Sequence, residues 1–126
     1  MVKLIVDTNF LIYLAKYKLL DKIGEYKLIL LKQVLQEIIF LSKNEKEKIQ
    51  DRDSCNLVLQ FLKSISDKVE YLSEIEGNAD NAIVDFCKKN NEKFLVGTMD
   101  KELISRLKKE KIKILIIRQK KLIEEK

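Results

Sequence analysis

Short apolar runs alternate with longer amphipathic segments along the chain. The runs are rich in β-branched side chains, which is typical of the buried strands of a parallel sheet. The intervening segments carry apolar residues three or four positions apart, which is the spacing of an amphipathic helix. This alternation predicts an α/β fold in which helices cover both faces of a parallel sheet. We expect strands at 2–6, 27–31, 69–72, 94–96 and 112–117.

Polar residues mark where the helices begin. Thr8 or Asn9 can cap the helix that follows the first strand. The charge-dense run at 43–53 is interpreted as a solvated, mobile opening to a longer helix, without chemistry of its own. We expect helices at about 9–20, 33–41 and 43–65, from Ala79, after Asp100, and as a short closing segment at 118–126.

Length and composition fit one domain spanning residues 1–126. The chain has 126 residues, of which 46% are hydrophobic and 36% charged, and this length suits a single core. No apolar run approaches the ~20 residues of a membrane span, and the first residues do not resemble a signal peptide. We therefore expect a cytoplasmic protein without a membrane partner. Cys55 and Cys87 fall inside apparent helices, which fits buried thiols in a reducing compartment.

The chain contains no histidine and only two cysteines. This composition excludes imidazole catalysis and the usual zinc site built of nitrogen and sulfur ligands. Any catalysis must use carboxylates, lysines, hydroxyls or a metal bound by oxygen. The net charge of +5 is compatible with a nucleic-acid partner, and equally with a solvated lysine-rich surface.

Four carboxylates occupy positions that converge if the sheet is parallel. Asp7 directly follows the first strand and Asp100 lies just past the fourth, and ligands of such sheets bind beyond the carboxyl ends of the strands. Glu37 lies at the margin of an apolar helical stripe, where it would be half-buried. Asp80 falls inside the apolar arc of its helix, whereas Asp85 falls on the solvated side. The four carboxylates of Asp7, Glu37, Asp80 and Asp100 can therefore reach the same rim of the sheet.

Each of these carboxylates also has an ordinary structural interpretation. Asp7 and Asp100 could cap the helices that follow them. Glu37 could be an exposed helix residue, and Asp80 could complement the dipole of its helix. Their joint placement at one end of one sheet favours a shared site over four separate coincidences.

Four motifs carry a resemblance to a known family: VDTN with Asp7, EI with Glu37, ADNAI with Asp80 and TMD with Asp100. Together they resemble the acidic motifs of the PIN domain. The spacing, the length and the ending LIIRQKKLI are similar to those of small archaeal single-domain members. Those members include VapC-like toxins and relatives that process ribosomal RNA. The chain departs from the pattern at Asn81, where relatives often have a second acid.

The resemblance implies a three-layer α/β/α fold with a five-stranded parallel sheet in the order 3-2-1-4-5. It also implies metal-dependent ribonuclease activity on RNA, frequent homodimers and, for the toxin branch, an antitoxin protein as partner. Mg²⁺ or Mn²⁺ would activate a water and neutralise phosphoryl oxygens, and these hard ions prefer carboxylate ligands. We assign Asp7, Asp80 and Asp100 as metal ligands, directly or through water; Glu37 as a ligand or the group that orients the attacking water; and Asn9 and Thr98 as supporting or phosphate-contacting residues.

Basic residues in the last quarter of the chain are candidates to guide an RNA backbone. For any single lysine among them, a solvated surface position is the better interpretation. The preference for RNA over DNA comes from the family resemblance alone. The candidates are Arg106, Lys108, Lys109, Lys111, Arg118, Lys120 and Lys121, of which Arg118, Lys120 and Lys121 are the first to test.

Two other functions are alternatives to the nuclease interpretation. A phosphoacceptor receiver domain would need a second acid after Asp7 and a lysine after the fifth strand, where this chain has Thr8 and Arg118. A PIN module that binds RNA without cleaving it would not need the intact acidic set. Within the nuclease interpretation, the toxin and the RNA-processing roles both stay open.

Overall fold

A single mixed sheet forms the centre of the molecule. The computed structural model describes residues 2–73, 77–90 and 94–125, so part of the loop expected at 73–78 lies outside the described residues. The strands are β1 (Lys3–Val6), β2 (Lys27–Leu31), β3 (Val69–Leu72), β4 (Phe94–Gly97), β5 (Lys113–Arg118) and β6 (Lys121–Glu125). Their order is β3-β2-β1-β4-β5-β6. The predicted order of the first five strands and their parallel pairing are confirmed.

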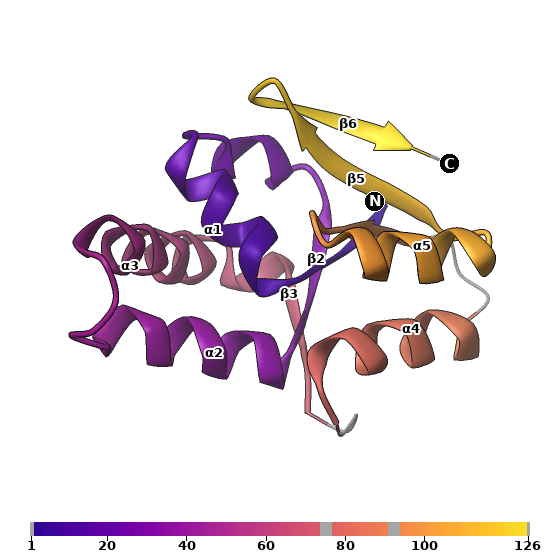
Figure 1. Ribbon diagram of the computed structural model, residues 1–126, viewed down its shortest axis with the longest axis horizontal. Coiled ribbons are helices and arrows are strands. Elements are labelled where there is room, and N and C mark those ends of the chain that lie inside the picture. Colours follow the sequence, from indigo (N-terminus) through magenta and orange to yellow (C-terminus); the bar gives the residue numbers. More distant parts are fainter. Residues whose placement is uncertain (1, 74–76, 91–93, 126) are drawn as a thin grey trace.

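Helices cover both faces of this sheet, as predicted. Figure 1 shows α1, α2 and α3 gathered on one side of the strands and α4 and α5 on the other. No helix in the described part of the chain is long and apolar enough to span a membrane. The helices are α1 (Thr8–Lys16), α2 (Lys32–Lys43), α3 (Ile49–Ser64), α4 (Ala79–Lys89) and α5 (Lys101–Lys109), with short 3₁₀ turns η1 (Leu20–Ile23) and η2 (Ser66–Lys68).

The central strand β1 is buried on both faces, because helices lie above and below it. Leu4, Ile5 and Val6 are almost completely inaccessible to solvent, which explains the continuous apolar run in the sequence. Val6 pairs with Gly97 at the end of β4. The backbone N–H of the next residue, Asp7, donates to the carbonyl oxygen of Gly97 at 3.1 Å. The first and fourth strands therefore end side by side, where the strand order reverses.

Gly97 allows α1 to pack directly onto the end of β4. A Cβ atom at this position would lie only 2.5 Å from a ring carbon of Phe10, and Phe10 is fully buried. The missing side chain lets the aromatic ring sit against the bare strand. This contact holds the start of α1 beside the loop that follows β4.

The C-terminal tail forms a hairpin, and the expectation of a closing helix is wrong. β6 runs antiparallel to β5, with Arg118 opposite Lys121, so the sheet has six strands instead of five. The two residues of the turn, Gln119 and Lys120, have φ angles of 52° and 59°, as in the type I′ turns that suit two-residue hairpins. The hairpin shares a groove with residues 19–26, which follow α1.

The charged run at 43–53 is less solvated than predicted. The helix α3 begins at Ile49, and Asp51 and Arg52 in its first turn are half-buried. Asp51 forms an ion pair with Lys16 of α1 at 2.7 Å. Asp51 thus connects the start of α3 to the end of α1.

Candidate active site

Asp7 occupies the junction between β1 and α1, and its side chain is only 8% exposed. Its Oδ1 atom accepts a hydrogen bond from the backbone N–H of Phe10 at 2.8 Å, so Asp7 caps α1. The expectation that Thr8 or Asn9 is the cap is wrong, because both residues lie inside the first turn. The cap uses one carboxylate oxygen of Asp7 and leaves the other available for a second partner.

That second partner is Thr98, which is fully buried just beyond β4. The Thr98 hydroxyl donates to Oδ2 of Asp7. The same hydroxyl oxygen accepts a hydrogen bond from the backbone N–H of Asp100 at 3.1 Å. A hydroxyl can donate once and accept twice, so Thr98 links the end of β1 to the start of α5 through one side chain.

Asp100 is exposed at the first position before α5. Its Oδ1 atom accepts from the backbone N–H of Leu103 at 2.9 Å, so it caps that helix as the structural interpretation predicted. The charge of Asp100 also raises the pKa values of Asp7 and Asp80. Capping and membership of the acidic group are therefore compatible at both Asp7 and Asp100.

Asp80 lies in the first turn of α4 and is half-buried, whereas Asp85 is exposed, in agreement with the helical pattern. Burial is the largest cause that raises the pKa of Asp80 above its usual range, and the charge of Asp100 adds to it. The guanidinium of Arg106 in α5 acts in the opposite direction. The structure thus brings Arg106, one of the basic residues selected from the sequence, into the electrostatic range of Asp80.

Burial raises the pKa of Asp7 to about 6 from 3.8. The hydrogen bonds from Thr98 and Phe10 favour the charged form but do not offset the loss of solvent. The nearby charges of Asp80 and Asp100 raise the value further. Asp7 at neutral pH is therefore a carboxylate whose ionisation costs folding free energy.

Glu37 projects from α2 and is exposed, so the prediction that it would be half-buried is wrong. The pattern placed it at the edge of an apolar stripe, and the structure puts that edge in solvent. Its Oε2 atom nevertheless accepts a hydrogen bond from the hydroxyl of Thr8 at 2.9 Å. Thr8 lies directly after Asp7, so this bond ties Glu37 to the start of α1. No sequence pattern indicated that Thr8 would position Glu37.

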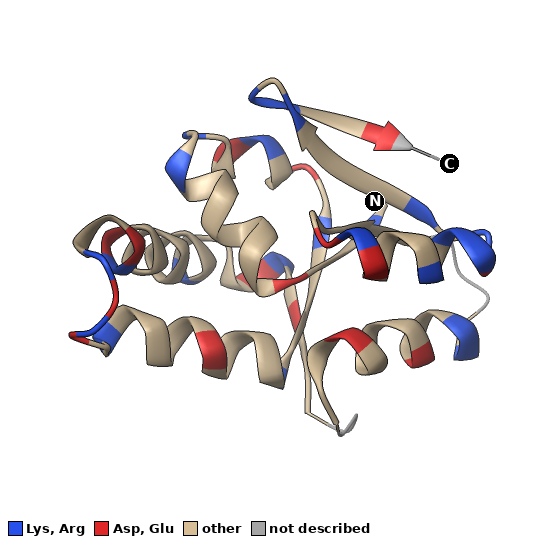
Figure 2. Ribbon diagram, viewed as in Figure 1, with Lys and Arg blue, Asp and Glu red and all other residues tan. Residues whose placement is uncertain are grey.

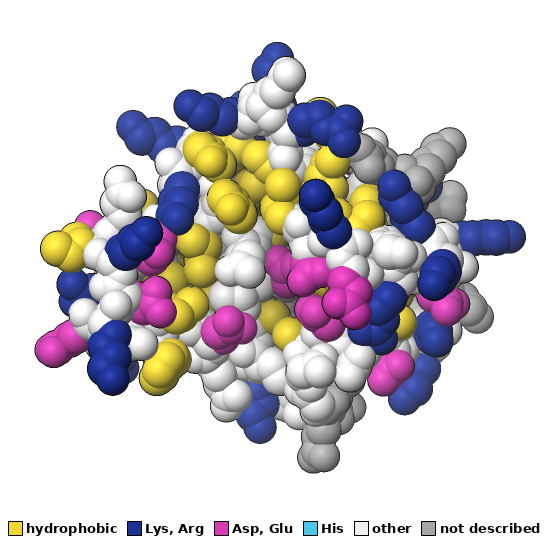
Figure 3. Space-filling view, in the orientation of Figure 1, with side chains coloured by type: hydrophobic (Ala, Val, Ile, Leu, Met, Phe, Trp, Pro, Cys, Tyr) yellow, Lys and Arg dark blue, Asp and Glu magenta, His cyan; other side chains and the backbone are white. Residues whose placement is uncertain are grey.

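The acidic residues are near one another without forming a closed metal cage. Acidic side chains gather over the N-terminal ends of α4 and α5, and lysines and arginines lie above and to the right of them in this view (Figures 2 and 3). Among residues 2–73, 77–90 and 94–125, no three carboxylate or thiol side chains are close enough to hold a metal ion by themselves. The donor set is nevertheless entirely oxygen, and its members repel one another. Such a set fits a hard divalent cation that keeps part of its water shell.

The remaining predicted residues lie on α1, on the C-terminal hairpin, and at or just after the end of α5, where Lys108 and Lys109 are in the last turn and Lys111 borders a cavity. Asn9 borders a groove with Glu37, next to the acidic group. Arg118, Lys120 and Lys121 lie on the β5–β6 hairpin. Glu102, which the sequence analysis did not select, also raises the pKa of Asp80, and its place two residues after Asp100 was the available signal.

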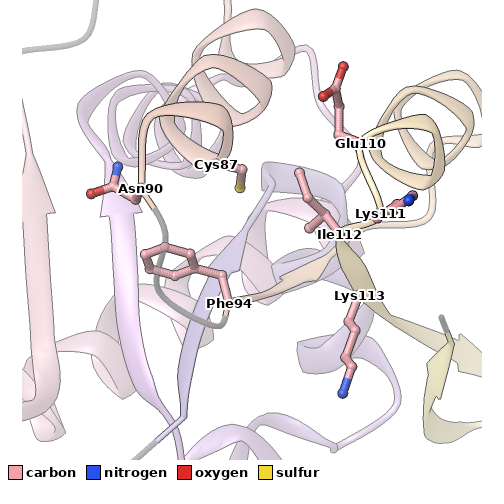
Figure 4. Close-up of a pocket in the computed structure, with 7 residues that line it drawn as sticks. All are labelled: Cys87, Asn90, Phe94, Glu110, Lys111, Ile112 and Lys113. Atoms are coloured by element: carbon pink, nitrogen blue, oxygen red, sulfur yellow. The ribbon is translucent and has the colours of Figure 1, made fainter.

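A separate cavity of about 270 Å³ lies at the opposite, amino end of β4 and β5. Figure 4 shows its lining, in which Phe94 and Ile112 face the sulfur of Cys87. Burial raises the pKa of the Cys87 thiol to about 12, so this thiol stays protonated and unreactive at neutral pH. The cavity therefore contributes nothing to the chemistry of the acidic residues.

The comparisons with known proteins agree with this geometry. A family model described as a PIN like domain matches residues 4–120. The chain is 32% identical to Ribonuclease VapC4 of Methanocaldococcus jannaschii over 131 aligned positions, covering 98% of this chain and 96% of that protein. It is also similar to the structure of the PIN domain endonuclease Utp24, with a TM-score of 0.75 and 25% identity over 98% of this chain and 90% of that one. Because the family model matches almost the whole length, this chain belongs to the PIN-domain family.

Proposed function

We propose that the protein is a metal-dependent endoribonuclease that hydrolyses phosphodiester bonds of RNA. The observation that carries this proposal is the buried carboxylate of Asp7, whose pKa is raised by burial and by the charges of Asp80 and Asp100. A fold rarely keeps such a carboxylate without a cation to offset its cost. Relatives named as a ribonuclease and an endonuclease support the same reaction.

Each acidic residue has a proposed role that follows from its position. Asp7, Asp80 and Asp100 would hold Mg²⁺ or Mn²⁺, and the bound ion would supply an activated water and neutralise phosphoryl charge. Hydrogen bonds from Phe10 and Thr98 fix both oxygens of Asp7, so its orientation is set before any ligand arrives. Glu37, held by Thr8, would accept a hydrogen bond from the attacking water.

The test is RNA cleavage in Mg²⁺ or Mn²⁺ by the wild type, Asp7→Asn and a matched control, Asp85→Asn. Asp85→Asn makes the same chemical change on the solvated side of α4. We expect Asp7→Asn to lower the cleavage rate by about 100-fold or more, and Asp85→Asn to cleave like the wild type. Equal cleavage by wild type and Asp7→Asn would point to a contaminating nuclease and sink the proposal.

The biological setting is part of the proposal. Similarity to Ribonuclease VapC4 over nearly the whole chain favours a cytoplasmic toxin, a homodimer countered by an antitoxin protein. Similarity to Utp24 keeps an RNA-processing role as the second candidate. A small antitoxin gene directly upstream would favour the toxin role. Binding of RNA without cleavage would instead favour the non-catalytic module.

A further inference from the structure

Two exposed tyrosines stack on each other along α1. Tyr13 is 39% and Tyr17 40% exposed. Their ring centroids are 5.9 Å apart, and the ring planes differ by only 10°. A single exposed apolar side chain needs no explanation, but a contiguous aromatic surface commonly marks a binding site.

Lysines from two parts of the chain lie over these rings. The Lys16 Nζ atom is 5.9 Å from the centroid of Tyr13, and the Lys120 Nζ atom is 5.8 Å from that of Tyr17. Both distances fall within the range of a cation–π contact. Lys120 lies in the turn of the β5–β6 hairpin. The hairpin therefore places the ammonium group of Lys120 beside the tyrosine pair, although these residues are far apart in the sequence.

The tyrosine pair is continuous with the candidate active site. Asn9, Tyr13 and Tyr17 are spaced four residues apart and therefore share one face of α1. Asn9 and Tyr13 line a groove of about 390 Å³ whose charged lining is Lys16 and the acidic residues Glu37, Glu47 and Asp51. At about 1.5 Å of rise per residue, Tyr13 and Tyr17 lie about 9 and 15 Å along the helix from Asp7. Figure 3 shows hydrophobic side chains between lysines over α1 and the hairpin, above the acidic patch.

We propose that Tyr13 and Tyr17 form a platform on which bases of single-stranded RNA stack as the strand enters the acidic site. Aromatic rings stack with every base, so such a platform binds RNA with little sequence preference. Lys120 contacts a phosphate beside the stacked bases, whereas the charge of Lys16 is already paired with Asp51. This inference rests on the proposed nuclease function and names the part of the surface that holds the substrate.

Electrostatics favours RNA over a protein as the occupant. The acidic group repels phosphate, so a polyanion needs positive charge close by to approach it. The cores of protein interfaces are depleted in lysine, because burying an ammonium group is costly. A tyrosine pair with Lys120 over one of its rings matches a strand of bases and phosphates better than it matches an apolar protein surface.

The test measures binding of a short fluorescein-labelled oligo(A) RNA by anisotropy, with the full chain in EDTA so that no cleavage occurs. Three variants are compared with the wild type. Tyr13→Leu/Tyr17→Leu keeps apolar side chains but removes the aromatic rings that stack. Tyr13→Phe/Tyr17→Phe keeps both rings. The matched control is Tyr71→Leu, which changes a tyrosine that is 49% exposed on β3. Circular dichroism and size-exclusion chromatography check that each variant folds and keeps its oligomeric state.

We expect the double leucine variant to weaken binding about tenfold or more, and the double phenylalanine and Tyr71→Leu variants to bind within about twofold of the wild type. An oligonucleotide of equal charge with abasic positions should bind the wild type about tenfold more weakly, and the double leucine variant should not distinguish the two. The chain has four tyrosines and no tryptophan. Quenching of tyrosine emission by the oligo(A) therefore tests stacking in the unmodified protein.

Three results would overturn the platform: wild-type affinity in the double leucine variant, equal affinity of the wild type for the abasic strand, or a change of oligomeric state in the leucine variant without loss of RNA binding. The last would assign the tyrosines to a protein interface. Failure of the nuclease proposal is a separate outcome. RNA binding that depends on the tyrosines, without cleavage in Mn²⁺, would support the platform and reject the nuclease proposal. Cleavage in Mn²⁺ with RNA binding that does not depend on the tyrosines would support the nuclease proposal and reject the platform.

Discussion

The two ends of β4 differ sharply in what they hold. At its carboxyl end, Thr98 links the buried carboxylate of Asp7 to the start of α5. At its amino end, Phe94 and Cys87 border a cavity with a protonated thiol, and the lining also includes charged residues such as Glu110 and Lys113. The helices that surround the strand point their N-termini at the first end, and N-termini stabilise anions. The direction of the parallel strands therefore places Asp7, Asp80 and Asp100 at the carboxyl end of the sheet.

The carboxyl end also shows that an aspartate can cap a helix and still belong to the acidic group. Asp7 and Asp100 cap α1 and α5 with one oxygen each. An aspartate that caps a helix after a parallel strand is already at the rim where ligands bind. The cap fixes the side chain of each aspartate, and in Asp7 the second oxygen is fixed as well by the hydroxyl of Thr98.

Removing the hydroxyl of Thr98 should have the largest effect, because it breaks the polar link at the carboxyl end. Thr98→Val keeps the shape but leaves Oδ2 of Asp7 without its donor. We expect cleavage or metal affinity to fall about 10–100-fold and stability to fall by about 1–3 kcal/mol. Cleavage assays and urea denaturation measure the two effects.

Thr98→Ser is the matched control, since it keeps the hydroxyl that donates to Asp7. It should recover most of the cleavage that the valine variant loses. If the valine variant cleaves as fast as the wild type, Thr98 does not orient Asp7 for the reaction, and the contrast between the two ends loses its functional meaning.

The pH dependence of stability should be comparable in size to the stability lost in Thr98→Val. The pKa of Asp7 is about 6 in the folded chain and near 3.8 when unfolded, so the folded state binds the proton more tightly. In EDTA, stability should be greatest below about pH 4, fall by about 3 kcal/mol as the pH rises to about 6, and level off above that. The raised pKa of Asp80 acts in the same direction.

Urea denaturation of the wild type and Asp7→Asn across this range measures the pH effect. The asparagine variant should lose most of the slope, because it has no proton to release. At neutral pH, Mn²⁺ should restore part of the wild-type stability and do little for the variant. A wild type whose stability rises from pH 4 to 6, or parallel curves for the two proteins, would contradict the raised pKa of Asp7.

The smallest effect should come from the amino-end cavity. Cys87→Val replaces a buried thiol with an apolar group of similar size, which cores usually tolerate within about 1.5 kcal/mol. We expect unchanged cleavage in Mn²⁺ and a small shift in the denaturation midpoint. A large loss of cleavage would mean that this end of the sheet communicates with the acidic residues, and the two regions could no longer be treated as independent.

Sequence patterns predicted much of this molecule, because strand burial and helix amphipathicity are local properties. They identified the five parallel strands and, through the solvated face of α4, separated Asp80 from Asp85. The strand order came from the family resemblance, and the structure agrees. Patterns failed where a contact depends on distant segments: Glu37 was expected to be half-buried, but its position depends on how α2 packs against its neighbours.

The C-terminal hairpin shows the same limit. Its turn contains Gln119 and Lys120 instead of the asparagine and glycine that usually announce a two-residue hairpin, so nothing local indicated it. Pairing with β5 decided the outcome, because an extended tail completes the backbone hydrogen bonds of an edge strand.

The sequence by itself determined the fold class and the acidic residues at the strand ends, since both follow from the periodicity of side chains along one segment. Only the tertiary structure decided that Thr98 joins Asp7 to Asp100 and that Lys120 lies over Tyr17. These contacts connect residues far apart in the chain, and their geometry depends on how the packed core places one element against another.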